Sequence, residues 1–107
     1  MPKTKLLFVC ILNLQRSPTA ESLFENYENY EAKSCGIDIS AEKQISKQAV
    51  EWADIIFCME DIHKNFIVKN FPQAQNKEII VFNIPDIYYR DDPELIRILK
   101  EKLKKYW

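Results

Sequence analysis

A cysteine and an arginine lie close together near the start of the sequence: Cys10 is followed, after five intervening residues, by Arg16 and Ser17. Arginine carries a planar fork of charged donors that matches two oxygens of a phosphate group. Cysteine is nucleophilic as its thiolate, which nearby cations and helix N-termini favour. The pair therefore indicates nucleophilic chemistry on a phosphorylated group, with Cys10 attacking and Arg16 holding the oxygens.

The five residues between Cys10 and Arg16 form a loop of the right length to surround an anion. Such a loop can curl so that its backbone N–H groups, with the free donors of a following helix, converge on one tetrahedral anion. Asn13 best tolerates the left-handed conformation that this arrangement needs, and Ser17 is placed to donate a hydroxyl hydrogen bond to the Cys10 sulfur. The loop residues expected to contact substrate are Ile11, Leu12, Asn13, Leu14 and Gln15, with Leu12 and Leu14 on an apolar rim.

The elements on either side of the loop favour this interpretation. Residues 5–9 contain an unbroken apolar run from Leu6 to Val9, typical of a strand buried on both faces of a parallel sheet. Ser17 and Pro18 are typical of a helix N-cap and first position, and apolar residues at helical spacing predict a helix over 18–29. The simpler alternative is that Cys10 is a buried thiol, Arg16 a surface charge and Ser17 only a helix start.

Strand and helix patterns alternate along the rest of the chain. Apolar runs predict strands over 30–35, 54–59 and 78–82, and 38–43 is expected to be a loop. Ser46 is expected to cap a short helix through Trp52, residues 60–70 form a further helix, and Asp92 caps a C-terminal one. This order predicts a single α/β domain over 1–107, a three-layer doubly wound sheet of about four parallel strands. Ligands bind such sheets at the carboxyl ends of the strands, where Cys10 lies.

Composition excludes several classes of function. The 15 basic and 16 acidic residues give a net charge of -1, which provides no general attraction to nucleic acid or membrane surfaces. No apolar run approaches a membrane span, so a cytoplasmic monomer is expected. Three cysteines without C-x-x-C spacing and a single histidine, His63, indicate neither a disulfide framework nor a zinc site. We expect reduced thiols and no metal or organic cofactor.

The sequence resembles the low-molecular-weight protein tyrosine phosphatases, whose nucleophile loop reads C-x-G-N-x-C-R-S-P. Four blocks match in order: residues 9–21 around the loop, 34–36 after the second strand, 53–59 at the third strand, and 84–89, which correspond to the family's V-P-D-P-Y-Y loop. The resemblance implies a phosphotyrosine phosphatase I-like fold. It also implies hydrolysis of phosphotyrosine in proteins, or of small aryl phosphates, through a cysteinyl-phosphate intermediate.

Departure of a phenol oxygen needs a general acid, and three aspartates are candidates. Asp92 precedes Pro93 at a helix start, where N-capping explains it, and Asp91 lies beside it. Asp86 directly follows the fourth strand and matches the family's acid, so we assign it this role. In the same loop, Tyr88 or Tyr89 is expected to stack on the substrate ring.

Three positions depart from the family pattern: Leu12 replaces a glycine, Gln15 a second cysteine, and Ile87 a proline. The segment between the second and third strands, which helps to wall the family's substrate cleft, is also short. A bulky Leu12 that tilts the loop amides would fit a phosphate-binding module without turnover.

Two other chemistries remain open. Arsenate reductases share this fold and loop but pass oxidation to further cysteines. Cys35 and Cys58 are the candidates for that role, but they lack the close spacing that such a relay uses. Cysteine-protease chemistry would need His63 as base, but His63 falls in a helix after a different strand.

Overall fold

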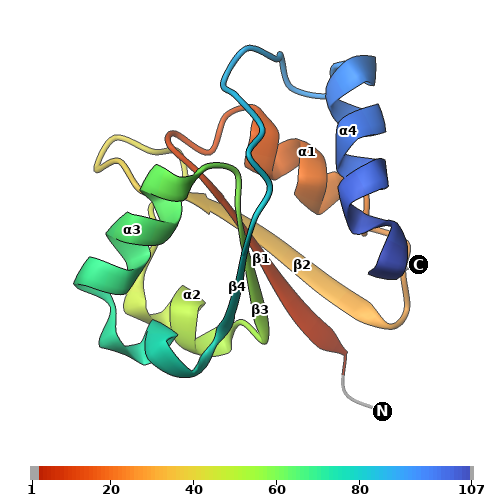
Figure 1. Cartoon of the computed structure of the whole chain (residues 1–107). Helices are drawn as coiled ribbons and strands as arrows, with labels where there is room; N and C mark the ends of the chain where they lie inside the picture. Colours follow the sequence, from red (N-terminus) through yellow and green to blue (C-terminus); the bar gives the residue numbers. More distant parts are fainter. Residues whose placement is uncertain (1–2, 107) are drawn as a thin grey trace.

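Four apolar segments form one parallel sheet in the computed structural model, which describes residues 3–106 of the chain (Figure 1). The strands are β1 (Thr4–Cys10), β2 (Tyr30–Gly36), β3 (Ile55–Cys58) and β4 (Glu78–Val81), in the spatial order β2-β1-β3-β4. All neighbouring pairs are parallel. The four predicted strands and their parallel arrangement are confirmed, with bounds that shift by one or two residues.

Four α-helices connect and cover the strands. They are α1 (Arg16–Ser22), α2 (Lys47–Trp52), α3 (Asp61–Asn70) and α4 (Pro93–Leu103), with short 3₁₀ helices at Pro72–Asn76 and Lys104–Tyr106. Ser46 caps α2 by accepting a hydrogen bond from the Ala49 N–H at 3.1 Å, and Asp92 caps α4 by accepting one from the Glu94 N–H at 2.8 Å. Both predicted caps are confirmed.

The first helix differs from the prediction at both ends. It begins at Arg16, so Ser17 lies inside the helix rather than at its N-cap, and it ends at Ser22 rather than at residue 29. From Leu23 onward the N–H groups bond to carbonyls three residues back, which tightens the chain into turns. These turns place Phe24 in the core, 5.9 Å from the ring of Phe8 and 5.4 Å from that of Tyr30 at the start of β2.

Each face of the sheet carries its own apolar layer. Alternate β1 residues point to opposite faces, because side chains alternate along a strand. Leu6 and Phe8 pack with α1 and α4, whereas Leu7 and Val9 pack with α2 and α3 (Figure 1). The predicted three-layer doubly wound fold is therefore confirmed.

The chain leaves β1 toward β2 on one side and later returns to β3 on the other side. The carboxyl end of β1 is thus the switch point at which ligands bind in such sheets, and Cys10 is its last residue. Within residues 3–106, no helix has the length and apolar composition needed to cross a lipid bilayer.

Candidate active site

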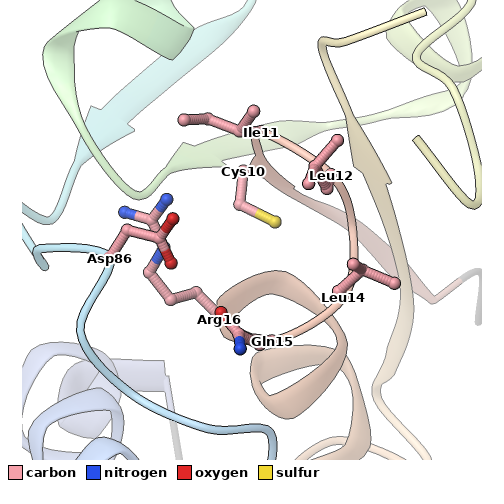
Figure 2. A pocket seen from close by; sticks show the side chains of 7 residues that line it. All are labelled: Cys10, Ile11, Leu12, Leu14, Gln15, Arg16 and Asp86. Atoms are coloured by element: carbon pink, nitrogen blue, oxygen red, sulfur yellow. The ribbon is translucent and has the colours of Figure 1, made fainter. Parts of the chain in front are cut away.

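The segment after β1 encloses a hollow at the carboxyl edge of the sheet. Figure 2 shows the Cys10 thiol pointing into the space that the loop surrounds, with Arg16 and Asp86 on the opposite side from Leu12 and Leu14. The residues that line this hollow are Cys10, Ile11, Leu12, Leu14, Gln15, Arg16 and Asp86. Six of the seven residues from 10 to 16, all except Asn13, therefore line one cavity together with Asp86.

The loop backbone is held with its carbonyl groups turned toward a neighbouring segment. Ile37 N–H donates to the Cys10 carbonyl at 3.0 Å, Asp38 N–H to Ile11 at 3.0 Å, and Glu42 N–H to Leu12 at 3.1 Å. The backbone N–H groups of residues 11–15 donate no hydrogen bond within the part of the chain that the structure describes. Several free N–H donors on a curled loop at a helix N-terminus form an anion-binding nest.

The left-handed residue of the loop is Asn13, with φ of 58°, as the sequence predicted. Leu12 is not among the described residues with positive φ, so a leucine at the family's glycine position strains nothing. Close packing is instead provided beneath the loop by Gly36, the only glycine in the chain. A Cβ at residue 36 would overlap the Ile11 carbonyl oxygen and lie 2.9 Å from the Asn13 nitrogen.

Ser17 connects the nucleophile to the loop. Its Oγ lies 2.9 Å from Cys10 Sγ and accepts a hydrogen bond from Asn13 Nδ2, also at 2.9 Å. The Ser17 hydroxyl hydrogen can point either to Cys10 or to the Cys35 carbonyl at 3.4 Å. The contact to Cys10 is the shorter of the two, and Asn13 supports Ser17 from outside the cavity lining.

Arg16 is almost fully buried and is fixed through one end of its guanidinium group. Its Nη1 donates to Glu60 Oε2 at 2.6 Å and to the Ile84 carbonyl at 2.7 Å. Its Nε lies 3.8 Å from Asp86 Oδ1. Because Nη1 is engaged by the protein, Nε and Nη2 remain as the edge that can form a bidentate contact with phosphate.

Glu60 was not among the predicted site residues. It lies two residues after the end of β3 and at the N-cap of α3, so it reaches the same edge of the sheet as Cys10. Its own N–H donates to His63 Nδ1 at 3.0 Å, and burial, with the nearby Arg16 charge adding to it, lowers the pKa of His63 to about 4. His63 is therefore a neutral, fully buried residue behind Arg16 rather than a base in the cavity.

The three candidate acids occupy different places. Asp86 lines the cavity, with about half of its side chain exposed. The Asp91 N–H donates to Thr19 Oγ1 at 2.8 Å, and Asp92 caps α4. Of the three, only Asp86 lines the cavity with Cys10 and Arg16, and its role as the acid stays a prediction.

The structure places the two tyrosines of the same segment outside the cavity lining. Tyr88 packs against the core and Tyr89 is 78% exposed. Stacking of either ring on a substrate stays a prediction.

The remaining thiols are poor nucleophiles. Burial raises the pKa of Cys35 well above its usual value and that of Cys58 to about 12. All three cysteines are free. Residues 3–106 contain no group of three or more His, Cys, Asp or Glu side chains that could hold a metal ion.

Comparison with known proteins gives one curated relative and several solved structures, although no family model matches the chain. The protein-arginine-phosphatase of Geobacillus stearothermophilus is 32% identical over 98 residues, a match that covers 68% of this chain and 66% of the relative. The chain thus spans slightly less than two thirds of that relative's length.

Solved structures match over nearly the whole chain. The YwlE arginine phosphatase of G. stearothermophilus has a TM-score of 0.73 at 27% identity, covering 96% of this chain and 94% of that one. The tyrosine phosphatase Wzb of Escherichia coli K30 has a TM-score of 0.78 at 20% identity, covering 98% and 96%. The low-molecular-weight protein tyrosine phosphatase of T. tengcongensis has a TM-score of 0.73 at 21% identity, covering 96% and 99%.

Proposed function

The chain belongs to the low-molecular-weight protein tyrosine phosphatase family, and from this premise we propose that it is a cysteine-dependent phosphatase that hydrolyses phosphotyrosine. One observation carries the proposal: the Cys10 thiol lies at the centre of a loop of free N–H donors, with Arg16 and Asp86 beside it. A nucleophile, an anion-binding nest and an acid within one hollow are the parts that phosphoryl transfer through cysteine requires.

In the first step the Cys10 thiolate attacks phosphorus in line with the leaving oxygen. A sulfur–phosphorus bond forms and the bond from phosphorus to the phenol oxygen breaks, while Asp86 gives its proton to that oxygen. The loop N–H groups and the free edge of Arg16 hold the three equatorial oxygens. The Ser17 hydroxyl, 2.9 Å away, donates to the attacking sulfur.

In the second step a water molecule attacks the cysteinyl-phosphate. Asp86, now ionised, accepts a proton from the water, the sulfur–phosphorus bond breaks, and inorganic phosphate leaves. The departing sulfur is again a thiolate, and Ser17 stabilises it in the same way. Each residue returns to its starting protonation state.

The lining of the cavity supports an aromatic substrate. Ile11, Leu12 and Leu14 form one wall, and Asp86 is the only carboxylate that lines the hollow among the described residues. A phenol ring is favoured by apolar contacts, whereas the guanidinium of phosphoarginine is a cation with several donors that need acceptors. The apolar wall therefore favours phosphotyrosine, although the relatives include arginine phosphatases.

An arsenate-reductase-like relay has little support from the remaining thiols. Such a relay needs a second thiolate that attacks the first cysteine. Cys35 and Cys58 are both buried and both hold their protons more tightly than an ordinary thiol, as their raised pKa values indicate. Leu12 has no positive φ, so a leucine at the family's glycine position needs no left-handed backbone.

The test uses the purified protein in EDTA with p-nitrophenyl phosphate, followed by two peptides of the same sequence that carry phosphotyrosine or phosphoarginine. We expect phosphate release in EDTA and a higher kcat/KM for the phosphotyrosine peptide. A higher kcat/KM for the phosphoarginine peptide would change the substrate class. Vanadate binding without release from any substrate would instead identify a binding module.

A further inference from the structure

Residues 83–92, which lie between β4 and α4, form a segment that we call the acid loop. It is attached at several points to α1 and to the loop from Cys10 to Arg16, which we call the phosphate loop. Near its start, the Ile84 carbonyl accepts from Arg16 Nη1 at 2.7 Å. Near its end, the Asp91 N–H donates to Thr19 Oγ1 at 2.8 Å. Asp86 lies between these anchors, so its position depends on what holds the middle of the acid loop.

The side-chain amide of Gln15 occupies that middle position. In the orientation that satisfies its neighbours, Gln15 Nε2 donates to Asp86 Oδ1 at 3.1 Å and to the Tyr88 carbonyl at 3.3 Å. Asn and Gln amide orientations are assigned from such hydrogen-bond networks. The backbone of Gln15 is fixed as well, because its backbone carbonyl accepts hydrogen bonds from the Thr19 N–H at 3.1 Å and from Thr19 Oγ1 at 2.7 Å.

The contacts to Asp86 distinguish its two carboxyl oxygens. Gln15 Nε2 and Arg16 Nε both approach Oδ1, at 3.1 Å and 3.8 Å. Oδ1 already accepts the Gln15 hydrogen bond and faces the Arg16 guanidinium, so a proton on Asp86 is carried by Oδ2. Oδ2 is then the atom that can donate to a leaving oxygen.

We propose that Gln15 is a positioning residue for the general acid: its amide holds the acid loop against the phosphate loop and orients Asp86 so that Oδ2 serves the leaving group. This inference rests on the proposed phosphatase function and adds a residue to it. The family pattern has a cysteine at this position, and a thiol has no pair of N–H donors with which to bridge Asp86 and Tyr88.

The test compares Gln15→Met, which keeps the length of the side chain but removes both donors, with the wild type. Exposed Gln48 on α2 provides a matched control, Gln48→Met, on the side of the sheet away from α1 and α4. Gln15→Met should lower kcat/KM for a phosphotyrosine peptide by about 10-fold, as expected for two partly exposed hydrogen bonds. Turnover of p-nitrophenyl phosphate, whose leaving group needs less protonation, should fall much less, and vanadate affinity should not change.

A second variant adds a readout that packing alone would not change. Gln15→Glu places a carboxylate beside Asp86, which favours a protonated Asp86 at higher pH. The alkaline limb of the kcat/KM profile for the phosphotyrosine peptide should therefore move upward by roughly one pH unit. An unmoved limb, or equal losses on both substrates in Gln15→Met, would overturn the positioning role.

Amide hydrogen exchange separates this inference from the proposed function, because it needs no turnover. Residues 86–90 should exchange faster in Gln15→Met than in the wild type, and at the wild-type rate in Gln48→Met. Unchanged exchange in Gln15→Met would overturn the inference even in an active enzyme. A wild type that releases no phosphate would refute the proposed function, while faster exchange in Gln15→Met would still support the attachment of the acid loop by Gln15.

Discussion

Replacing Asp86 or Asp92 should have opposite consequences, because one carboxylate lines the cavity and the other caps a helix. Asp86 Oδ1 lies 3.8 Å from Arg16 Nε, next to the anion nest. A general acid contributes about 10²–10⁴-fold when the leaving oxygen is basic. Asp86→Asn should slow the phosphotyrosine peptide by that factor and p-nitrophenyl phosphate less, since p-nitrophenolate leaves without full protonation.

The expected effect of Asp92→Ala is on stability. Asp92 accepts one exposed hydrogen bond from the Glu94 N–H at 2.8 Å, and loss of such a cap costs about 0.5–2 kcal/mol. For a domain of this size, 1 kcal/mol corresponds to a change of roughly 4–8 °C in Tm. Turnover per folded molecule should be unchanged.

Both quantities are measured on both variants: kcat/KM across a series of aryl phosphates whose leaving phenols differ in acidity, and Tm by thermal unfolding. In Asp86→Asn the rate should depend more steeply on leaving-group acidity than in the wild type. If Asp92→Ala acquires the steeper dependence while Asp86→Asn behaves as the wild type, the acid assignment is refuted. The acid loop would then not lie over the substrate as the proposed mechanism requires.

Three further changes test the rest of the site. Cys10→Ser should abolish turnover while vanadate still binds, measured by kinetics and titration calorimetry, because the loop N–H groups and Arg16 remain; wild-type turnover would exclude Cys10 as nucleophile. Arg16→Lys should lower kcat/KM by roughly 10²-fold or more, because an ammonium cannot form the bidentate contact; a mild loss would place residue 16 outside the phosphate site. Burial lowers the pKa of His63 to about 4, against an ordinary value of 6.5. Between these two pH values the unfolded state binds a proton at His63 and the folded state does not. The free energy of unfolding in urea should therefore fall with decreasing pH by at most about 1.4 kcal/mol per unit, and His63→Gln should remove this part of the slope.

The strands were predictable because parallel strands buried on both faces need continuous apolar runs, and residues 6–9, 55–59 and 79–82 provide them. The C-terminal end of α1 was not predictable in the same way. Leu23, Phe24 and Tyr27 have helical spacing, but they reach the core equally well from the turns that follow Ser22. Spacing reports which residues face the core and not which hydrogen-bond pattern brings them there.

The site was predictable where it depends on neighbours in sequence and less so where it depends on the meeting of strand ends. The loop from Cys10 to Ser17 is a local feature. Glu60 could have been found, because a carboxylate directly after β3 must lie at the same sheet edge as Cys10. The contact between Gln15 and Asp86 depends on the reach of one side chain across two loops, which no pattern along the chain encodes.

Gly36 has a consequence for the interpretation of mutational surveys. It contacts no substrate in the proposed mechanism, yet any side chain there would collide with the Ile11 carbonyl and push against the Asn13 nitrogen, both in the loop whose N–H groups form the nest. In a saturation mutagenesis screen scored by activity, position 36 should tolerate substitution as poorly as Cys10 does. The exposed Leu12 and Leu14 should accept other apolar residues, which keep the wall of the cavity. Such a screen would thus find the buried end of β2 more sensitive to substitution than much of the loop that holds the phosphate. Read alone, it would place the active site beneath that loop rather than in it.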